Sequence, residues 1–416
     1  MAQSDPADIP LPEPLTAAEV GTFTHYSVVE RLPEIARRTI NENRFPAQVE
    51  ESIYTLIESI PHGPIRQLTD RQAPDAFDWR RYIEGYEGQN WLHVPWFFAE
   101  TYFYRRLLEA TGYFREGPLG GVDPFDSQKR QGLETTRPGL AELARELAGW
   151  LEPGAWSRED FLQVLRIALW GNQADLSLWP AGDDEQPVGA GEDAAGSRLI
   201  ADDSGAVADY LAARQGEPAR VDMIGDNAGF ELVTDLALLD YLLTTGAAHV
   251  VTLHLKAHPT FVSDAMSKDA HDTVEFLLLE DDDAVRAFGK RLREHLDAGR
   301  LRLQEDFYWN SPLALWALPR LMQDEFNSSD LVISKGDANY RRLLGDRHWP
   351  FTVGFAEVAG YFLPPLLALR TCKSEVAVGL RAGQAPALTQ RDPDWLINGE
   401  WGMVQFKPRS GGLSRE

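Results

Sequence analysis

The chain of 416 residues is poor in cysteine, with Cys372 alone, and it has no cluster of histidine and cysteine. One cysteine excludes an internal disulfide and suits a reducing compartment. No apolar run approaches the roughly 18 to 20 residues of a membrane-spanning helix. Residues 1–14 lack the basic start and the apolar stretch of a signal peptide. These absences predict a soluble, cytoplasmic protein that does not bind membranes.

Basic residues are also scarce. Forty lysines and arginines stand against 64 aspartates and glutamates, which gives a net charge of −24. This charge repels the phosphates of nucleic acids, and no basic patch interrupts it, so nucleic acid is not expected as a partner. A small anionic ligand would need a local positive site made of a metal ion with lysine or arginine. A monomer is expected.

Apolar residues make up 44% of the chain and show two different spacings. From 27 to 171 they recur mostly every three or four residues, which predicts an N-terminal all-helical domain over residues 25–178. Beyond it, short apolar runs alternate with amphipathic stretches, which predicts an α/β domain with a mostly parallel sheet over residues 198–407. Helices are expected to continue to about Leu303. The segment from Trp401 to Phe406 is interpreted as a last strand, at an edge of the sheet.

Four segments are expected to lie outside regular structure. Residues 1–24 and 408–416 would be flexible ends, and the acidic tract 179–197 would be a solvated linker or an inserted loop. The run from 115 to 138 is rich in glycine and proline and too long for one turn. It is expected to be a loop that lies over another part of the molecule.

Short polar motifs follow four of the predicted strands. In an open α/β sheet, ligands bind outside the carboxyl ends of the strands, so the side chains of these motifs should converge. Acid groups without histidine or cysteine suit a hard divalent cation, and lysines suit a phosphate. The pattern predicts a metal-dependent enzyme that acts on a phosphorylated small molecule. The strands and their motifs are Val221–Gly225 with Asp226 and Asn227, Val250–Leu255 with Lys256 and Asp264, Leu331–Ser334 with Lys335 and Asp337, and Leu366–Leu369 with Arg370 and Lys373.

Each motif also has a purely structural interpretation. Asp226 and Asn227 could cap the helix that follows them. The segment 370–373 could be the solvated, cationic end of a strand. A plain turn would explain the glycine, aspartate and asparagine of the segment 335–341, but not its lysine and arginine. The placement of all these motifs at the ends of neighbouring strands favours a functional site.

Other motifs are weaker. The glycines at 189 and 191 follow no strand, so they do not indicate a dinucleotide site. His254 and His258 have no third zinc ligand. Asp392 lacks the preceding apolar strand of an aspartyl phosphatase, and Cys372 lacks a histidine partner.

Taken in order, the motifs resemble those of the damage-control phosphatase family, and the resemblance extends from about residue 25 to 407. The Arg-Thr-x-Lys run is similar to that of the subgroup of acidic residue methyltransferase 1 proteins, which are sugar phosphate phosphatases. The resemblance implies a metal-dependent phosphatase with a helical N-terminal region and a three-layer α/β/α C-terminal region. Similar proteins act on fructose 1-phosphate and fructose 6-phosphate in metabolite damage control. The motifs are Asp226–Glu231, Ser263 with Asp264, Lys335–Arg341 and Arg370–Lys373.

The resemblance also implies site residues. Asp226, Asn227 and Asp264 match metal ligands, for Mn²⁺ or else Co²⁺, Ni²⁺ or Mg²⁺, and with Lys373 they form the expected catalytic set. Lys373 would contact the substrate phosphate with help from Lys335 or Arg341. Asp337 would either orient the attacking water or bind a sugar hydroxyl together with Asn339. The residues expected to contact substrate are Lys335, Asp337, Asn339, Tyr340, Arg341, Lys373 and Glu100.

Glu100 enters this set because of its surroundings. The segment from Trp96 to Arg106 is apolar nearly all round, so as a helix it must be buried on several faces. A buried glutamate is costly unless it is paired. Glu100 is expected to face a basic residue of another element or the hydroxyl groups of the substrate, with the ion pair favoured.

Two rival functions come from other classes. A protein carboxyl methyltransferase that uses S-adenosylmethionine should have a glycine-rich turn after its first strand. Here Leu199–Ala201 leads into Asp202–Gly205, which has one glycine. A non-catalytic metabolite-binding protein has little use for a set of metal-binding carboxylates.

Overall fold

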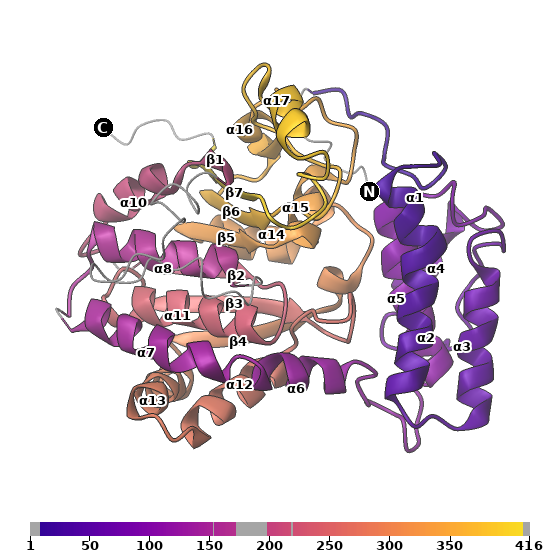
Figure 1. Ribbon diagram of the computed structural model, residues 1–416, viewed down its shortest axis with the longest axis horizontal. Coiled ribbons are helices and arrows are strands. Elements are labelled where there is room, and N and C mark those ends of the chain that lie inside the picture. The colour runs from indigo at the N-terminus through magenta and orange to yellow at the C-terminus, as the bar shows by residue number, and fades with distance from the viewer. Residues whose placement is uncertain (1–8, 153, 172–197, 218, 411–416) are drawn as a thin grey trace.

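The computed structural model describes residues 9–152, 154–171, 198–217 and 219–410. Figure 1 shows a column of N-terminal helices standing beside a sheet that is enclosed by the remaining helices. The expected α/β class, with a mostly parallel sheet and a helical N-terminal part, is confirmed. The acidic tract 179–197 lies outside the described residues.

The sheet has seven strands in the order β1-β7-β6-β5-β2-β3-β4. All neighbouring strands run parallel except β6 and β7, which are antiparallel. Every residue of β3, β5 and β6 is buried, as expected for parallel strands covered on both faces. The strands are β1 (Leu199–Asp202), β2 (Arg220–Ile224), β3 (Val250–Lys256), β4 (Leu301–Asp306), β5 (Leu331–Lys335), β6 (Leu366–Thr371) and β7 (Gly402–Lys407).

Two strands differ from expectation. The expected edge strand from Trp401 to Phe406 is β7, and it lies inside the sheet because it pairs with β6 on one side and β1 on the other. One edge is instead β4, in a region where helices were expected to reach about Leu303. Leu301 is the only buried residue of β4, and the strand is polar after Leu303, so its apolar signal is weak.

Helices cover both faces of the sheet. Alternate apolar side chains of the strands, such as Met223 and Ile333, pack against one set of helices, whereas Ile224 and Val332 face the other. The first set is α7 (Arg137–Leu151), α8 (Arg158–Trp170), α10 (Ser204–Ala212), α11 (Phe230–Thr244), α12 (Ser267–Leu279) and α13 (Asp283–Asp297). The second face is covered by α14 (Arg320–Asn327), α15 (Asp337–Leu344) and α16 (Phe355–Val358), while α17 (Gln384–Arg391) packs near β1 and β7.

The N-terminal helices pack around α5. Nearly every residue of α5 is buried, as its continuous apolar run predicts, and it packs against α2 and α3. Sequence spacing grouped α7 and α8 with these helices over residues 25–178, whereas the structure packs α7 on α13 and α8 on α10 and α11. The helices of this part are α1 (Phe23–Tyr26), the π-helical turn at Ser27–Arg31, α2 (Leu32–Glu42), α3 (Ala47–Ser59), α4 (Ala76–Glu84) and α5 (Trp96–Thr111).

One helix lies in the run 115–138, which was expected to be a loop. It is α6 (Asp126–Glu134), and its Lys129 is buried between Asp123, at 3.0 Å, and Asp269 of α12, at 2.9 Å. The helix is polar and is held by these ion pairs, so it has no apolar periodicity to indicate it. Through Lys129, α6 is fastened to the helices on the sheet.

The segment that precedes α1 links the two parts of the molecule. The backbone N–H of Leu15 donates to Asp346 after α15, and the carbonyl of Leu15 accepts from Trp96 at the start of α5. Leu15 itself is buried. Residues 9–24 therefore pack along both parts, where a flexible segment was expected. At the other end, Ser410 donates to the carbonyl of Leu363.

Within the four described ranges, no helix has both the length and the apolarity needed to cross a membrane.

Candidate active site

The candidate site lies at the carboxyl ends of β2, β3, β5 and β6. The loops that follow β2 and β3 are joined by an antiparallel bridge between Asn227 and Asp264. Ala228 N–H donates to the Ser263 carbonyl at 2.7 Å, and Ala265 N–H donates to the Asp226 carbonyl at 2.8 Å. This pairing places the three expected metal ligands side by side, although they lie almost 40 residues apart in the chain.

The carboxylates of this site are buried. Asp226 is 8% exposed and Asp264 is 1% exposed. Burial, with the nearby charges of Glu231 and Asp264, raises the pKa of Asp226 well above its usual range. Burial also raises the pKa of Asp264, more than the neighbouring Lys256 lowers it. Clustered carboxylates away from water favour a bound cation.

The donor atoms suit a hard divalent cation. Asp264 Oδ2 lies 3.3 Å from Lys256 Nζ, yet it accepts no hydrogen bond in the described part of the chain. Asn227 Oδ1 accepts from Ser263 Oγ and retains a second lone pair. Among the described residues, no group of three acids, histidines or cysteines could hold an ion. The amide of Asn227 and oxygens from water or substrate would have to complete the shell.

Gly336 allows the backbone after β5 to approach the carboxylate of Asp226. Its φ is 87°, and a Cβ at this position would lie 2.0 Å from Asp226 Oδ2. Only glycine fits both the left-handed backbone and the close contact. The β5–α15 turn therefore forms one wall of the expected metal site.

Lys335, expected to contact substrate, is instead held inside the protein. Its ammonium pairs with Glu231 and lies 3.4 Å from Asp235, one helical turn further along α11. Burial alone would lower the pKa of Lys335, but Asp235 and Glu231 raise it. Lys335 therefore offsets the negative charge of these two acids beneath the site. Sequence reasoning did not include Glu231 and Asp235 in the site, although acids four residues apart share one helix face.

Asp235 gives a testable pH dependence. Neither of its carboxylate oxygens accepts a hydrogen bond from the described residues, and burial raises its pKa from 3.8 to about 7 despite Lys335. A carboxyl with a raised pKa in the folded state costs stability as the pH rises from its unfolded value towards 7. We expect Asp235→Asn to stabilise the protein at pH 8, by on the order of 1 kcal/mol, and not at pH 4. Melting temperatures across this range measure the effect. A lower stability of the variant at pH 8 would contradict it.

Asp337 is fixed by three hydrogen bonds to one oxygen. Its Oδ1 accepts from Arg370 Nε at 2.7 Å, from the backbone of Lys373 at 3.0 Å and from Ser374 Oγ at 3.1 Å. Burial alone would raise the pKa of Asp337, but Arg370 and Arg341 lower it. An ionised carboxylate results. Its Oδ2 accepts no hydrogen bond from the described residues, so this oxygen remains uncommitted.

Lys373 is the lysine at the site with a free ammonium. Its side chain is partly exposed, and no described carboxylate lies within 4.0 Å of its Nζ. Its positive charge nevertheless acts on Asp226 and Glu231 and favours their ionised forms. Lys373 therefore stands close to the carboxylates without being neutralised by one of them.

Asn339 and Tyr340 hold α15 in place. Asn339 Nδ2 donates to the carbonyls of Gly225, at 2.9 Å, and Lys335, at 2.8 Å. The hydroxyl of Tyr340 donates to Gln405 Oε1 at 2.8 Å. Both side chains are buried. The structure thus brings these residues next to the site. The amide nitrogen of Asn339 and the hydroxyl of Tyr340 bond to the protein, whereas Asn339 Oδ1 accepts no hydrogen bond in the described part of the chain.

Arg341 and Glu100 join the two parts of the molecule. Arg341 pairs with Glu100 of α5 and with Asp346, and its guanidinium lies 3.5 Å from the ring centroid of Trp96. Glu100 also accepts from Ser27 Oγ at 3.1 Å. The basic residue expected opposite Glu100 is therefore Arg341. In this structure neither side chain is free to contact a substrate.

This contact predicts the effect of Glu100→Gln. Removing one charge of a buried ion pair weakens the fold. Arg341 still pairs with Asp346 in the variant, so the free energy of unfolding is expected to fall by about 1–2 kcal/mol. Thermal melting measures it. Rates should fall by the same factor for sugar phosphates and for an aryl phosphate. A changed ranking of sugar phosphates, with the aryl phosphate unaffected, would mean that Glu100 contacts the sugar.

Sequence comparison identifies the family to which this arrangement belongs. The model of the damage-control phosphatase ARMT1-like domain matches residues 27–388. The chain belongs to the ARMT1-like damage-control phosphatases. A member of this family is expected to be a hydrolase that removes phosphate from a small molecule.

Two relatives support the assignment, each aligned over 95% of this chain. Damage-control phosphatase ARMT1 of Danio rerio is 33% identical, with 95% of this chain and 97% of the relative aligned. The protein of the same name from Homo sapiens is 28% identical, with 95% and 98% aligned. Among solved structures, a DUF89 family protein of Pyrococcus horikoshii is 15% identical, with a TM-score of 0.46 over 88% of this chain and 94% of that one.

Proposed function

We propose that this protein is a metal-dependent phosphatase that hydrolyses sugar phosphates of the fructose 1-phosphate or fructose 6-phosphate type. Asp226, Asn227 and Asp264 would hold the metal, with Mn²⁺ as the first choice and Co²⁺, Ni²⁺ or Mg²⁺ as alternatives. The main support is the placement of two buried carboxylates on paired loops beside the free ammonium of Lys373. Such a site accepts one cation and one phosphate.

When bound, a divalent cation supplies an acidified water and neutralises charge on the phosphoryl oxygens. Lys373 would bind the phosphate and stabilise the negative charge that develops during transfer. The uncommitted Oδ2 of Asp337 would orient the attacking water or accept a hydrogen bond from a sugar hydroxyl. Lys335 would act electrostatically, because it neutralises negative charge of Glu231 and Asp235 below the site.

A phosphate-release screen tests the proposal. Purified protein is treated with chelator, reloaded with each divalent metal and assayed with hexose, pentose and nucleotide phosphates. We expect release from fructose phosphates that depends on metal and is lost on chelation. Equal rates with and without metal would refute the metal site. Binding of S-adenosylmethionine by calorimetry, with no phosphate release from any ester, would favour the methyltransferase instead.

A further inference from the structure

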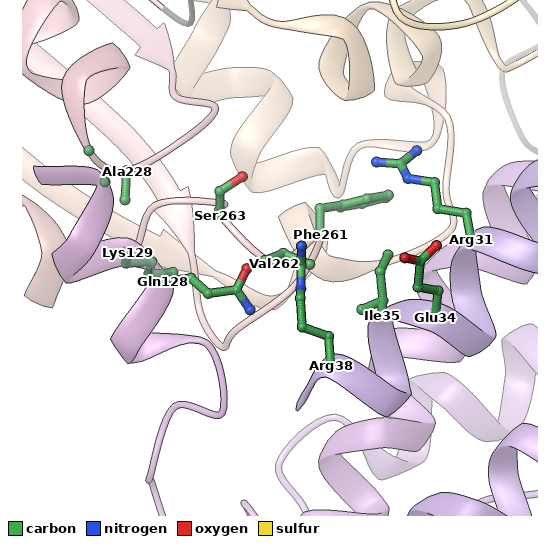
Figure 2. A pocket seen from close by; sticks show the side chains of 12 residues that line it. Arg31, Glu34, Ile35, Arg38, Gln128, Lys129, Ala228, Phe261, Val262 and Ser263 are labelled. Atoms are coloured by element: carbon green, nitrogen blue, oxygen red, sulfur yellow. The ribbon is translucent and has the colours of Figure 1, made fainter. Parts of the chain in front are cut away.

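A cavity of about 480 Å³ opens beside the paired loops of the site (Figure 2). Its volume is in the range of small-molecule sites. Three parts of the fold form it: the helical N-terminal part, α6, and the loops that follow β2 and β3. The lining residues are Arg31, Glu34, Ile35, Arg38, Gln128, Lys129, Gly132, Ala228, Gly229, Phe261, Val262 and Ser263.

This cavity adjoins the expected metal ligands. Ser263 in its wall precedes Asp264 and donates its hydroxyl to Asn227 Oδ1 at 2.5 Å. The two residues before it, Phe261 and Val262, have φ values of 46° and 69°. A left-handed backbone is strained for such residues, above all for a β-branched valine, and strain of this kind clusters at functional sites. A molecule in the cavity would contact the loops that carry Asn227 and Asp264, through Ala228 and Ser263 in the cavity wall.

The charges of the cavity favour an anion. Arg31 makes no ion pair with any described residue, and the nearest carboxylate to Arg38 is the partly exposed Glu42, at 3.8 Å. Lys129 is already neutralised by Asp123 and Asp269. Glu34 is the one acid in the lining. Within the described part of the chain, Arg31 is thus unpaired, and Arg38 has only a long, partly exposed ion pair with Glu42. Both guanidinium groups line one cavity, in a chain whose net charge is −24.

The side chains are directed so that they can act on one ligand. Figure 2 shows Arg38 extending from α2 towards Val262, with Gln128 reaching into the same opening from α6. Arg31 stands over Phe261. Guanidinium groups bind phosphate and carboxylate oxygens in pairs, so this arrangement suits an anionic group at the mouth of the cavity.

We propose that the cavity binds the leaving alcohol of the substrate, and that Arg31 and Arg38 select alcohols that carry a second anionic group. The preferred class would be sugar bisphosphates or phosphorylated sugar acids. This inference rests on the proposed phosphatase activity. It assigns specificity to two residues of the N-terminal part, which lie outside the motifs of the sheet.

The test compares fructose 1,6-bisphosphate with fructose 1-phosphate in wild type and in Arg31→Gln, Arg38→Gln and the double variant. We expect the double variant to raise KM for the bisphosphate about tenfold and to leave KM for the monophosphate unchanged. Glu34→Gln should lower KM for the bisphosphate. Arg37→Gln is the matched control, because Arg37 is an exposed arginine of α2 that does not line the cavity.

Equal effects of the double variant on both substrates would overturn the inference, as would a wild type that does not favour the bisphosphate. If the wild type releases phosphate from no ester, the proposed function fails on its own. Calorimetry with the same two sugar phosphates then tests whether the cavity binds a second anionic group. Tighter binding of the bisphosphate that is lost in the double variant supports the anion site, and equal binding in both proteins refutes it.

Discussion

Asp226→Asn is expected to lower kcat/KM at least about a hundredfold while the metal-free protein keeps its stability or gains some. Asp226 shares a buried site with Glu231 and Asp264, and its pKa is raised by that burial and by those charges. A carboxylate whose folded pKa is raised costs stability at neutral pH, and the neutral amide removes this cost without changing the shape. Steady-state kinetics and thermal melting in chelator measure the two effects.

Metal titration makes the test sharper. A cation that binds the folded state alone raises the melting temperature, so Mn²⁺ should stabilise wild type clearly more than Asp226→Asn. Asp281→Asn is a suitable control, because Asp281 is an exposed aspartate after α12. A metal-free variant that melts below wild type would contradict the prediction. Asp226 would then be a structural residue before α11.

Lys373→Met is expected to raise the barrier of the phosphate-transfer step by at least about 2 kcal/mol, roughly thirtyfold in kcat/KM. The ammonium of Lys373 pairs with no described carboxylate, so its loss breaks no ion pair there. The melting temperature should fall only slightly, because Lys373 no longer favours the ionised forms of Asp226 and Glu231. Methionine retains an unbranched apolar stem. The lost rate would therefore report on the phosphate contact and not on the fold. The fold decrease in kcat/KM should be the same for one sugar phosphate and for one aryl phosphate.

Two further variants define the role of the charge. Lys373→Arg keeps the positive charge and should retain part of the activity. Lys290→Met removes an exposed lysine of α13 and should have no effect. A near-normal rate in Lys373→Met would return the segment 370–373 to the simple interpretation of a solvated strand end.

Strand ends could be predicted because parallel strands have a strong local signal. The core strands β2, β3, β5 and β6 are buried almost throughout and rich in apolar residues, and a polar motif after such a strand marks its carboxyl end. The same reasoning places Asp226, Asp264, Asp337 and Lys373 at one edge of the sheet. The paired loops of Asn227 and Asp264 agree with that placement.

Elements held by long-range contacts could not be predicted in this way. The polar helix α6 is fastened by Lys129 to an aspartate 140 residues further along the chain, and no periodicity in its own sequence indicates this pair. β7 lies inside the sheet because its backbone bonds to β1 and β6. Such pairings depend on where distant segments meet.

Sequence alone determined the α/β class, the positions of the main strands along the chain and the motifs at their ends, because these follow from local apolar spacing and from residue type. Tertiary structure decided which charges remain available. Lys335 and Arg341 are neutralised by acids of other elements, 104 and 241 residues away, whereas Lys373 pairs with no acid of the described ranges. Partners so distant in the chain become neighbours only after packing, and burial then makes each such pairing energetically necessary.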